Sequence, residues 1–241
     1  KPLHKIAGFE MISWVIDATR AAGAEHIIPV IRDGTPDLVS FLSGYSVAVQ
    51  RNQKGTADAV MAALPHVKNR VQPILVLCAD TPFINKDIIC ELLDKIKSGS
   101  DICVLGFTAE NPHGYGRLVT SSSGSLVSII EDSEASISEK MIKNVNAGIM
   151  AFNGPIIEET IQKITPSNSK QEYFLTDIVS VGSKNNLSVD YILTDKEHVI
   201  GINNLEQLAI AEAIAQNNLR RKAMLSGVTM IAPETVFLQK D

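Results

Sequence analysis

One aspartate of the sequence stands where a metal ion could be held. Asp80 follows residues 73–78, a continuous apolar run that predicts a buried strand. In open α/β sheets ligands bind beyond the carboxyl ends of the strands, so a carboxylate at this point is well placed to hold Mg²⁺ against phosphate groups. A turn or helix cap is the alternative. We favour the metal, because the strand is apolar throughout and the acid comes directly at its end.

An asparagine near the far end of the chain could supply a neutral oxygen to a cation. Asn203 lies in Gly-Ile-Asn-Asn-Leu at residues 201–205, just before a long Ala-rich helix. Its amide oxygen is a neutral ligand that a hard cation accepts. Taken alone, the position favours a helix N-cap over a metal ligand.

The segment from Gln50 to Ala57 leaves a short strand and enters a helix. Gly55 would let the backbone approach a flat ligand closely. Thr56 could cap the helix, whose first amides suit anionic or carbonyl groups. An ordinary strand–turn–helix connection explains the segment equally well.

Two polar residues suit a sugar. Glu131 follows a strand-like run, and Asn146 precedes Ala-Gly-Ile, whereas Gly116, in His-Gly-Tyr-Gly-Arg at residues 113–117, indicates a bent strand entry with exposed backbone amides. A carboxylate and an amide on neighbouring strands can bind sugar hydroxyls and an N-acetyl group. A glycine turn, a salt-bridged glutamate and a turn asparagine are the alternatives.

The elements that must position these residues alternate between strand and helix. The pattern indicates an α/β fold with a mostly parallel sheet flanked by helices, because the strands are continuously apolar. Strands are predicted at 26–31, 46–49, 73–78, 101–107, 146–152 and 187–193, a hairpin at 117–120 and 126–130, and helices at 11–22, 37–42, 56–64, 86–97, 156–164, 176–185 and 205–224.

Composition excludes several classes of protein. The 241 residues carry 22 Lys+Arg and 27 Asp+Glu, a net charge of −5, which argues against nonspecific binding to nucleic acid or anionic membranes. No apolar run reaches the ~18 residues of a membrane span, so membrane insertion is not expected. Three cysteines without a C-x-x-C spacing suggest a reducing compartment, and hence the cytoplasm.

Taken in order, the motifs resemble the uridylyltransferase domain of the bacterial bifunctional N-acetylglucosamine-1-phosphate uridylyltransferase/glucosamine-1-phosphate N-acetyltransferase family. Each motif is weak alone, but the ordered set is specific and covers nearly the whole chain. The set comprises Lys-Pro-Leu-His at 1–4, Gln50 with Gly-Thr-Ala at 55–57, Ala-Asp-Thr-Pro at 79–82, Gly-Tyr-Gly-Arg at 114–117, Glu131, Asn-Ala-Gly-Ile at 146–149, Tyr-Phe-Leu-Thr-Asp at 173–177 and Gly-Ile-Asn-Asn at 201–204.

The resemblance implies a role for each candidate residue. The uracil nucleoside would be held by Gln50, Gly55 and Thr56, and the N-acetylglucosamine moiety by Gly116, Glu131 and Asn146. Mg²⁺, the implied cofactor, would be bound by Asp80 and Asn203, with Cys78 and Ala79 lining the nucleotide. The catalytic groups would be Asp80 and Lys1, whose ammonium would contact phosphate.

The implied reaction joins UTP and N-acetylglucosamine 1-phosphate to give UDP-N-acetylglucosamine and pyrophosphate, for peptidoglycan and lipopolysaccharide precursors. The phosphate oxygen of the sugar is already anionic, so the attack needs no general base, and catalysis rests on positioning and charge neutralisation. A transferase for another base or sugar is the near alternative, and a non-catalytic nucleotide-sugar-binding module is the more distant one. Ala79 and Asp58 depart from the residues common in the family, Gly and His.

The resemblance also divides the chain. It implies a nucleotidyltransferase domain at 1–204, with a nucleotide-binding part at about 1–110 and a smaller β-rich sugar-binding part at about 111–204. A linking helix at 205–226 and the start of a left-handed β-helix at 227–241 would follow. Because the family's Gly-rich phosphate loop precedes the position of Lys1, we expect a chain truncated at both ends that is poorly active and lacks acetyltransferase activity. The full-length protein is expected to be a homotrimer and this chain a monomer.

Overall fold

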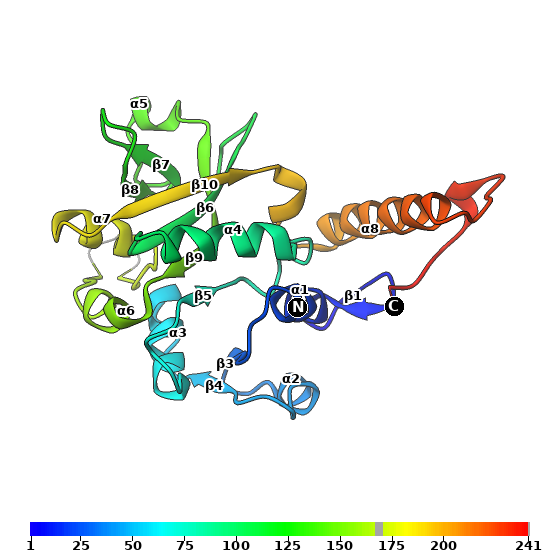
Figure 1. Ribbon diagram of the computed structural model, residues 1–241, viewed down its shortest axis with the longest axis horizontal. Helices are drawn as coiled ribbons and strands as arrows, with labels where there is room; N and C mark the ends of the chain where they lie inside the picture. The colour runs from blue at the N-terminus through cyan, green and yellow to red at the C-terminus, as the bar shows by residue number, and fades with distance from the viewer. Residues whose placement is uncertain (167–170, 241) are drawn as a thin grey trace.

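The computed structural model describes residues 1–166 and 171–240. Residues 167–170, inside the predicted sugar-binding part, and Asp241, the last residue of the predicted tail, lie outside the described residues. A six-stranded sheet forms the centre of the fold (Figure 1). Its strands are β5 (Ile74–Val76), β6 (Ile102–Thr108), β7 (Arg117–Thr120), β8 (Leu126–Ile130), β9 (Asn144–Phe152) and β10 (Val189–Thr194).

The strand directions require one correction to the predicted sheet. β10 pairs with β6 in parallel, but β9 lies between β5 and β6 and runs antiparallel to both. Strands β5, β6 and β10 therefore point the same way, as expected, while the pairs that β9 and the β7–β8 hairpin make are antiparallel. Continuous apolar runs predict strands but carry no direction, because direction depends on which strand lies alongside.

Helices cover both faces of the sheet, as the α/β pattern predicts. Successive side chains of a strand point to opposite faces, and in β6 Val104 packs in one core while Leu105 packs in the other. The first core includes residues of α3 (Thr56–Ala63), α6 (Gly154–Ile161) and α7 (Asp177–Lys184), and the second includes residues of α1 (Met11–Ala21) and α4 (Lys86–Lys97). The predicted α/β class is confirmed.

Smaller elements surround this body. They are the β1 (Lys5–Ile6) and β2 (Phe9–Glu10) hairpin, the parallel pair β3 (Val30–Arg32) and β4 (Ala48–Gln50), α2 (Pro36–Phe41), α5 (Ile137–Lys140), and the 3₁₀ turns Leu64–His66, Lys196–Val199 and Pro233–Thr235. The strand predicted at 26–31 is reduced to β3. The strand predicted at 73–78 is half-buried rather than buried, because in the described part of the chain β5 pairs with β9 alone.

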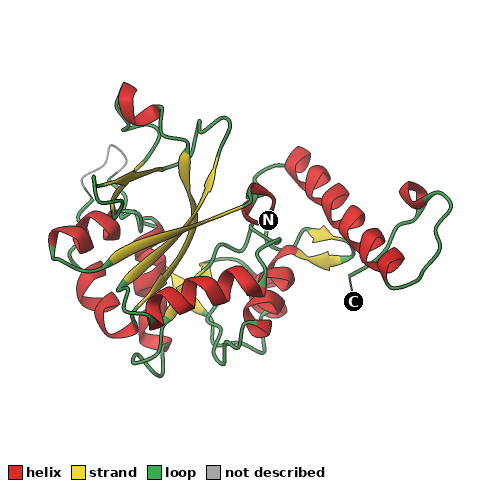
Figure 2. Cartoon of the chain, turned by 45° about the horizontal axis from the view of Figure 1, so that its top comes forward, coloured by secondary structure: helices red, strands yellow, loops and turns green. Residues whose placement is uncertain are grey.

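Helix α8 (Leu205–Leu225) extends away from the sheet, and the segment after it returns toward the amino terminus (Figures 1 and 2). Gln216 Nε2 donates to the carbonyl of Leu238 at 2.7 Å, and the amide of Lys240 donates to the carbonyl of Ala7 at 2.9 Å. The segment that follows α8 therefore packs against the turn of the β1–β2 hairpin. None of the described helices is long and apolar enough to cross a membrane.

Candidate functional site

Three polar side chains from distant parts of the chain meet at one point. The ammonium of Lys1 lies 2.5 Å from Oδ2 of Asp80 and 2.9 Å from Oδ1 of Asn203. Asp80 follows β5, and Asn203 lies just before α8. A carboxylate and an amide oxygen thus converge on one cationic group.

The backbone holds these segments together. The amide of Ile202 donates to the carbonyl of Asp80 at 2.9 Å, which fixes the loop before α8 against the turn after β5. Asn204, not Asn203, is the N-cap of α8, and its side chain accepts from the amide of Gln207 at 2.8 Å. The N-cap interpretation of Asn203 was therefore wrong by one residue, and its side chain is left to face Lys1.

The pair of oxygens suits a divalent cation as well as an ammonium. Asp80 does not cap α4, whose N-cap is Asn85, and its side chain is 29 % exposed, so water and ligand can reach it. Within residues 1–166 and 171–240 no group of three or more His, Cys, Asp or Glu side chains could hold a metal. One carboxylate supplemented by water and substrate phosphates is the usual arrangement for Mg²⁺, so the donor set fits that ion.

Cys78 lies beside the aspartate and stays protonated. Burial, with the charge of Asp80 as a smaller cause, raises the pKa of its thiol to about 11. The thiol contacts the carbonyl of Gly148 at 3.3 Å. A neutral, hydrogen-bonded thiol can line a ligand but is a poor nucleophile at neutral pH. Ala79, the next residue, is half-buried against the cluster around Ile12 and Leu42.

The segment that begins at Gln50 is held in a defined conformation. Gln50 Nε2 donates to the carbonyl of Gly55 and to Oδ2 of Asp58, both at 2.8 Å. Gly55, with φ of 112°, is the N-cap of α3, and Thr56 does not cap it, which corrects that prediction. Thr56 Oγ1 instead accepts from the amide of Leu175 at 2.8 Å. The segment is therefore fastened to residues more than 100 positions away.

The three residues predicted to face a sugar are neighbours. The amide of Asn146 donates to the carbonyl of Gly116 at 2.8 Å. A Cβ on Gly116 would lie 3.5 Å from Oε2 of Glu131. Asn146 sits where the β6–β9 register shifts, and its Oδ1 accepts from the amide of Gly148 at 3.0 Å. Such irregularities re-aim side chains next to binding sites.

Several carboxylates lie close together around Glu131. Thr176 Oγ1 donates to Oε1 of Glu131 at 2.9 Å. Burial raises the pKa of the adjacent Asp177, and the charges of Glu134 and Glu131 raise it further. Carboxylates in such a group repel phosphate and accept from hydroxyls, so this end suits the hydroxyl groups of a sugar.

Comparison with known proteins assigns the family. Residues 1–143 match the family described as MobA-like NTP transferase domain, which is more than half of the chain. This chain belongs to the MobA-like NTP transferase family. It is therefore a member of a nucleotidyltransferase family.

Relatives support the resemblance stated from the motifs. The chain is 38 % identical to the bifunctional protein GlmU of Bartonella quintana and 41 % identical to that of Xanthobacter autotrophicus, each over 245 aligned residues. Each alignment covers all of this chain but only 54 % of the relative, so the chain spans about half the length of these relatives. The predicted resemblance to the bifunctional uridylyltransferases is thereby confirmed.

A solved structure supports the fold of this MobA-like domain. A crystal structure from Bacillus anthracis described as a glucose-1-phosphate thymidylyltransferase superposes with a TM-score of 0.71 at 19 % identity. The match covers 89 % of this chain and 86 % of that one. At this identity the similarity establishes a shared fold.

The MobA-like domain contains one buried cation that the motif analysis did not single out. The side chain of Arg117 is 2 % exposed, donates from Nη1 to the carbonyl of Tyr115, and donates from Nη2 to Oδ1 of Asp132 at 2.7 Å. It thereby ties the Gly-Tyr-Gly turn before β7 to the residue after Glu131. An arginine next to two glycines was the available signal, but its burial depends on tertiary packing.

Lowering the pH should weaken the ion pair between Arg117 and Asp132. A hydrogen bond from the Gly114 backbone, and then the Arg117 guanidinium, lower the pKa of Asp132. Because the folded pKa lies below the unfolded one, the pairing stabilises the fold above the usual aspartate range and is lost as pH falls through the folded pKa. We expect the difference in melting temperature between the natural protein and Asp132→Asn to shrink as pH falls below about 4. A difference that stays constant from pH 7 to pH 3 would contradict this.

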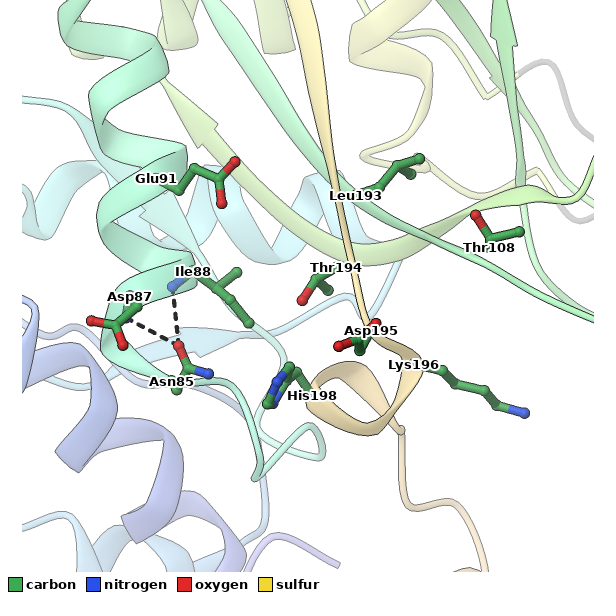
Figure 3. Close-up of a pocket in the computed structure, with 10 residues that line it drawn as sticks. All are labelled: Asn85, Asp87, Ile88, Glu91, Thr108, Leu193, Thr194, Asp195, Lys196 and His198. Atoms are coloured by element: carbon green, nitrogen blue, oxygen red, sulfur yellow. Dashed lines mark hydrogen bonds between the residues drawn. The ribbon is translucent and has the colours of Figure 1, made fainter.

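A hollow of about 530 Å³ lies elsewhere on the molecule, between α4 and the end of β10 (Figure 3). Its lining includes Asn85, whose side chain accepts from the amides of Asp87 and Ile88, with Asp195 and His198 on the other side. None of the predicted site residues lines it. A large pocket is the default candidate for a binding site. Here the side-chain oxygens of Asp80 and Asn203, which contact the Lys1 ammonium, lie outside the hollow, so the candidate site lies at those oxygens instead.

Proposed function

We propose that this chain is the uridylyltransferase part of a bifunctional enzyme and transfers a uridylyl group from UTP to N-acetylglucosamine 1-phosphate. The observation that carries the proposal is the convergence of Asp80 and Asn203 on one cationic group. Family membership supports nucleotidyl transfer, and the relatives named GlmU favour this pair of substrates.

The residues at the centre act by binding and charge neutralisation. Asp80 and Asn203 would hold Mg²⁺, which when bound neutralises phosphate charge and orients the triphosphate. The ammonium of Lys1 is close enough to contact the same phosphates. A phosphate oxygen of the sugar phosphate forms a bond to the α-phosphorus of UTP, and the bond to the β-phosphate breaks as pyrophosphate leaves. The attacking oxygen already carries negative charge, so no residue needs to take up a proton.

The two substrates would bind on either side of this centre. The segment of Gln50, Gly55 and Thr56 offers backbone groups to the uracil nucleoside, beside Cys78 and Ala79. Gly116, Glu131 and Asn146 offer a carboxylate, an amide and close backbone approach to N-acetylglucosamine. The surplus of carboxylates near Glu131 favours hydroxyl donors there, which leaves the phosphate to face Lys1.

We further propose that residues 1–204 form the nucleotidyltransferase domain, with its sugar-binding part from about residue 111, and that α8 and residues 227–241 lead to a second domain. The bifunctional relatives are about twice as long as this chain, which supports a longer protein. In that protein we expect a cytoplasmic homotrimer that supplies cell-wall precursors.

Pyrophosphate release by the full-length protein tests the substrates. With Mg²⁺ present, we expect UTP with N-acetylglucosamine 1-phosphate to give kcat/KM at least about tenfold above dTTP or CTP, and above glucose 1-phosphate as acceptor. A preference for another base or for glucose 1-phosphate would replace this assignment by another sugar nucleotidyltransferase. Calorimetric binding of UDP-N-acetylglucosamine without any turnover would favour a nucleotide-sugar-binding module instead.

A further inference from the structure

Lys1 occupies the position between Asp80 and Asn203 that a metal ion would take. Its side-chain ammonium group contacts both oxygens, at 2.5 and 2.9 Å. We propose that Lys1 competes with the divalent cation for these two oxygens, so that the metal binds weakly until the ammonium has moved aside. This inference rests on the proposed function, because it takes Asp80 and Asn203 as the metal ligands.

The geometry makes the two cations mutually exclusive. Mg²⁺ binds oxygen ligands at about 2.0–2.1 Å, so an ion that touches both oxygens must lie where they converge. Nζ of Lys1 already lies within hydrogen-bond distance of both. An ammonium and a divalent ion a few ångströms apart also repel each other. The metal therefore enters only when Lys1 leaves.

The ion pair is weak enough to be displaced. The Lys1 side chain is 40 % exposed and that of Asp80 29 %. Ion pairs this open to water are only modestly stable, because solvent screens them and the long lysine side chain loses entropy on pairing. While it is in place, the ammonium compensates the Asp80 charge and holds the two segments in contact. Lys1 is thus a reversible substitute for the metal.

Displacement leaves the ammonium free beside the site. A nucleoside triphosphate that arrives with the metal offers Lys1 a new anionic partner, whereas the metal alone offers none. The competition therefore favours binding of metal together with triphosphate over binding of metal alone. Lys1 would couple the two ligands without being a metal ligand itself.

Metal binding in the absence of nucleotide tests the competition. We would titrate the 241-residue chain with Mn²⁺, following free Mn²⁺ by electron paramagnetic resonance at fixed pH and ionic strength. Lys1→Met should bind Mn²⁺ about 3- to 10-fold more tightly than the natural protein, because it removes both the ion pair and the repulsion. Lys1→Arg keeps the charge and should bind as weakly as the natural protein.

Lys5→Met is the matched control. Lys5 is four residues away, is 64 % exposed and lies 3.6 Å from Glu10 rather than near Asp80. Its removal changes the net charge equally, so its Mn²⁺ affinity should stay within about twofold of the natural value at ordinary salt. Circular dichroism should show all three lysine variants folded, since both side chains are exposed.

The outcomes separate the inference from the function on which it rests. Asp80-dependent Mn²⁺ binding that Lys1→Met leaves unchanged or weakens would overturn the competition and leave the metal site standing. An equal gain in Lys5→Met would also overturn it, because the effect would then be one of net charge. If Asp80→Asn leaves Mn²⁺ binding unchanged, the metal site fails, and the proposed function with it.

Discussion

Replacement of Asp80 by asparagine is expected to lower kcat for uridylyl transfer by about 100- to 1,000-fold, the range typical for loss of one group that stabilises transition-state charge. The substitution keeps the shape of the side chain and removes its charge. The amide of Ile202 binds the backbone carbonyl of Asp80, not its carboxylate, so the contact between the two segments persists. The variant should therefore fold normally while binding the metal poorly.

Steady-state kinetics at several Mg²⁺ concentrations, together with thermal unfolding, would measure this effect. Asp94→Asn is a suitable control, since Asp94 is exposed on α4 and pairs with Lys97 at 3.3 Å. We expect the control to match the natural enzyme. Normal rate and normal Mg²⁺ dependence in Asp80→Asn would remove Asp80 from the metal site.

The second large effect is expected from Gly55→Ala. Gly55 has φ of 112°, and a Cβ there would lie 2.5 Å from the carbonyl oxygen of Tyr173 and 2.9 Å from its backbone N and C. The backbone cannot move aside easily, because Tyr173 N donates to Lys54 O at 2.7 Å and Ala57 N donates to Tyr173 O at 2.9 Å. We expect a loss of about 2–4 kcal/mol in the free energy of unfolding, from strain and overpacking together.

Urea unfolding would measure that loss, with Gly44→Ala as the control. Beyond its two chain neighbours, no residue has an atom within 4 Å of a Cβ built on Gly44, and its φ lies outside the range that side chains rarely adopt. Gly44→Ala should be close to neutral. The surviving folded fraction of Gly55→Ala should also show a raised KM for UTP, because Gln50 binds the carbonyl of Gly55. A loss below about 0.5 kcal/mol would show that the two segments can separate without cost.

Local patterns predicted much of this fold, because they depend on neighbours in sequence. The helix predicted at 86–97 matches α4, whose apolar residues recur at helical spacing and whose N-cap is Asn85. The hairpin predicted at 117–120 and 126–130 matches β7 and β8. Strand direction was beyond such patterns, since the placement of β9 between β5 and β6 depends on contacts between distant segments.

The candidate site was likewise predicted only in part from the sequence. Motif order alone brought Asp80 and Asn203 into one hypothesis, although they are far apart in the chain. Whether Asn203 or Asn204 caps α8 could not be decided from two adjacent asparagines, because either can cap a helix. In the structure Asn204 caps the helix by accepting from the amide of Gln207, and Asn203 Oδ1 accepts from the Lys1 ammonium.

The amino-acid sequence by itself determined which residue types the chain has available for binding a cation and a sugar, and which short segments fold into strands and helices. Tertiary structure alone decided that the Lys1 ammonium lies between the two oxygens and that Arg117 is buried beneath the Gly-Tyr-Gly turn. The reason is physical. Helical and strand periodicity arises from neighbouring residues, whereas the pairing of charges depends on distances that exist only after distant segments have packed together.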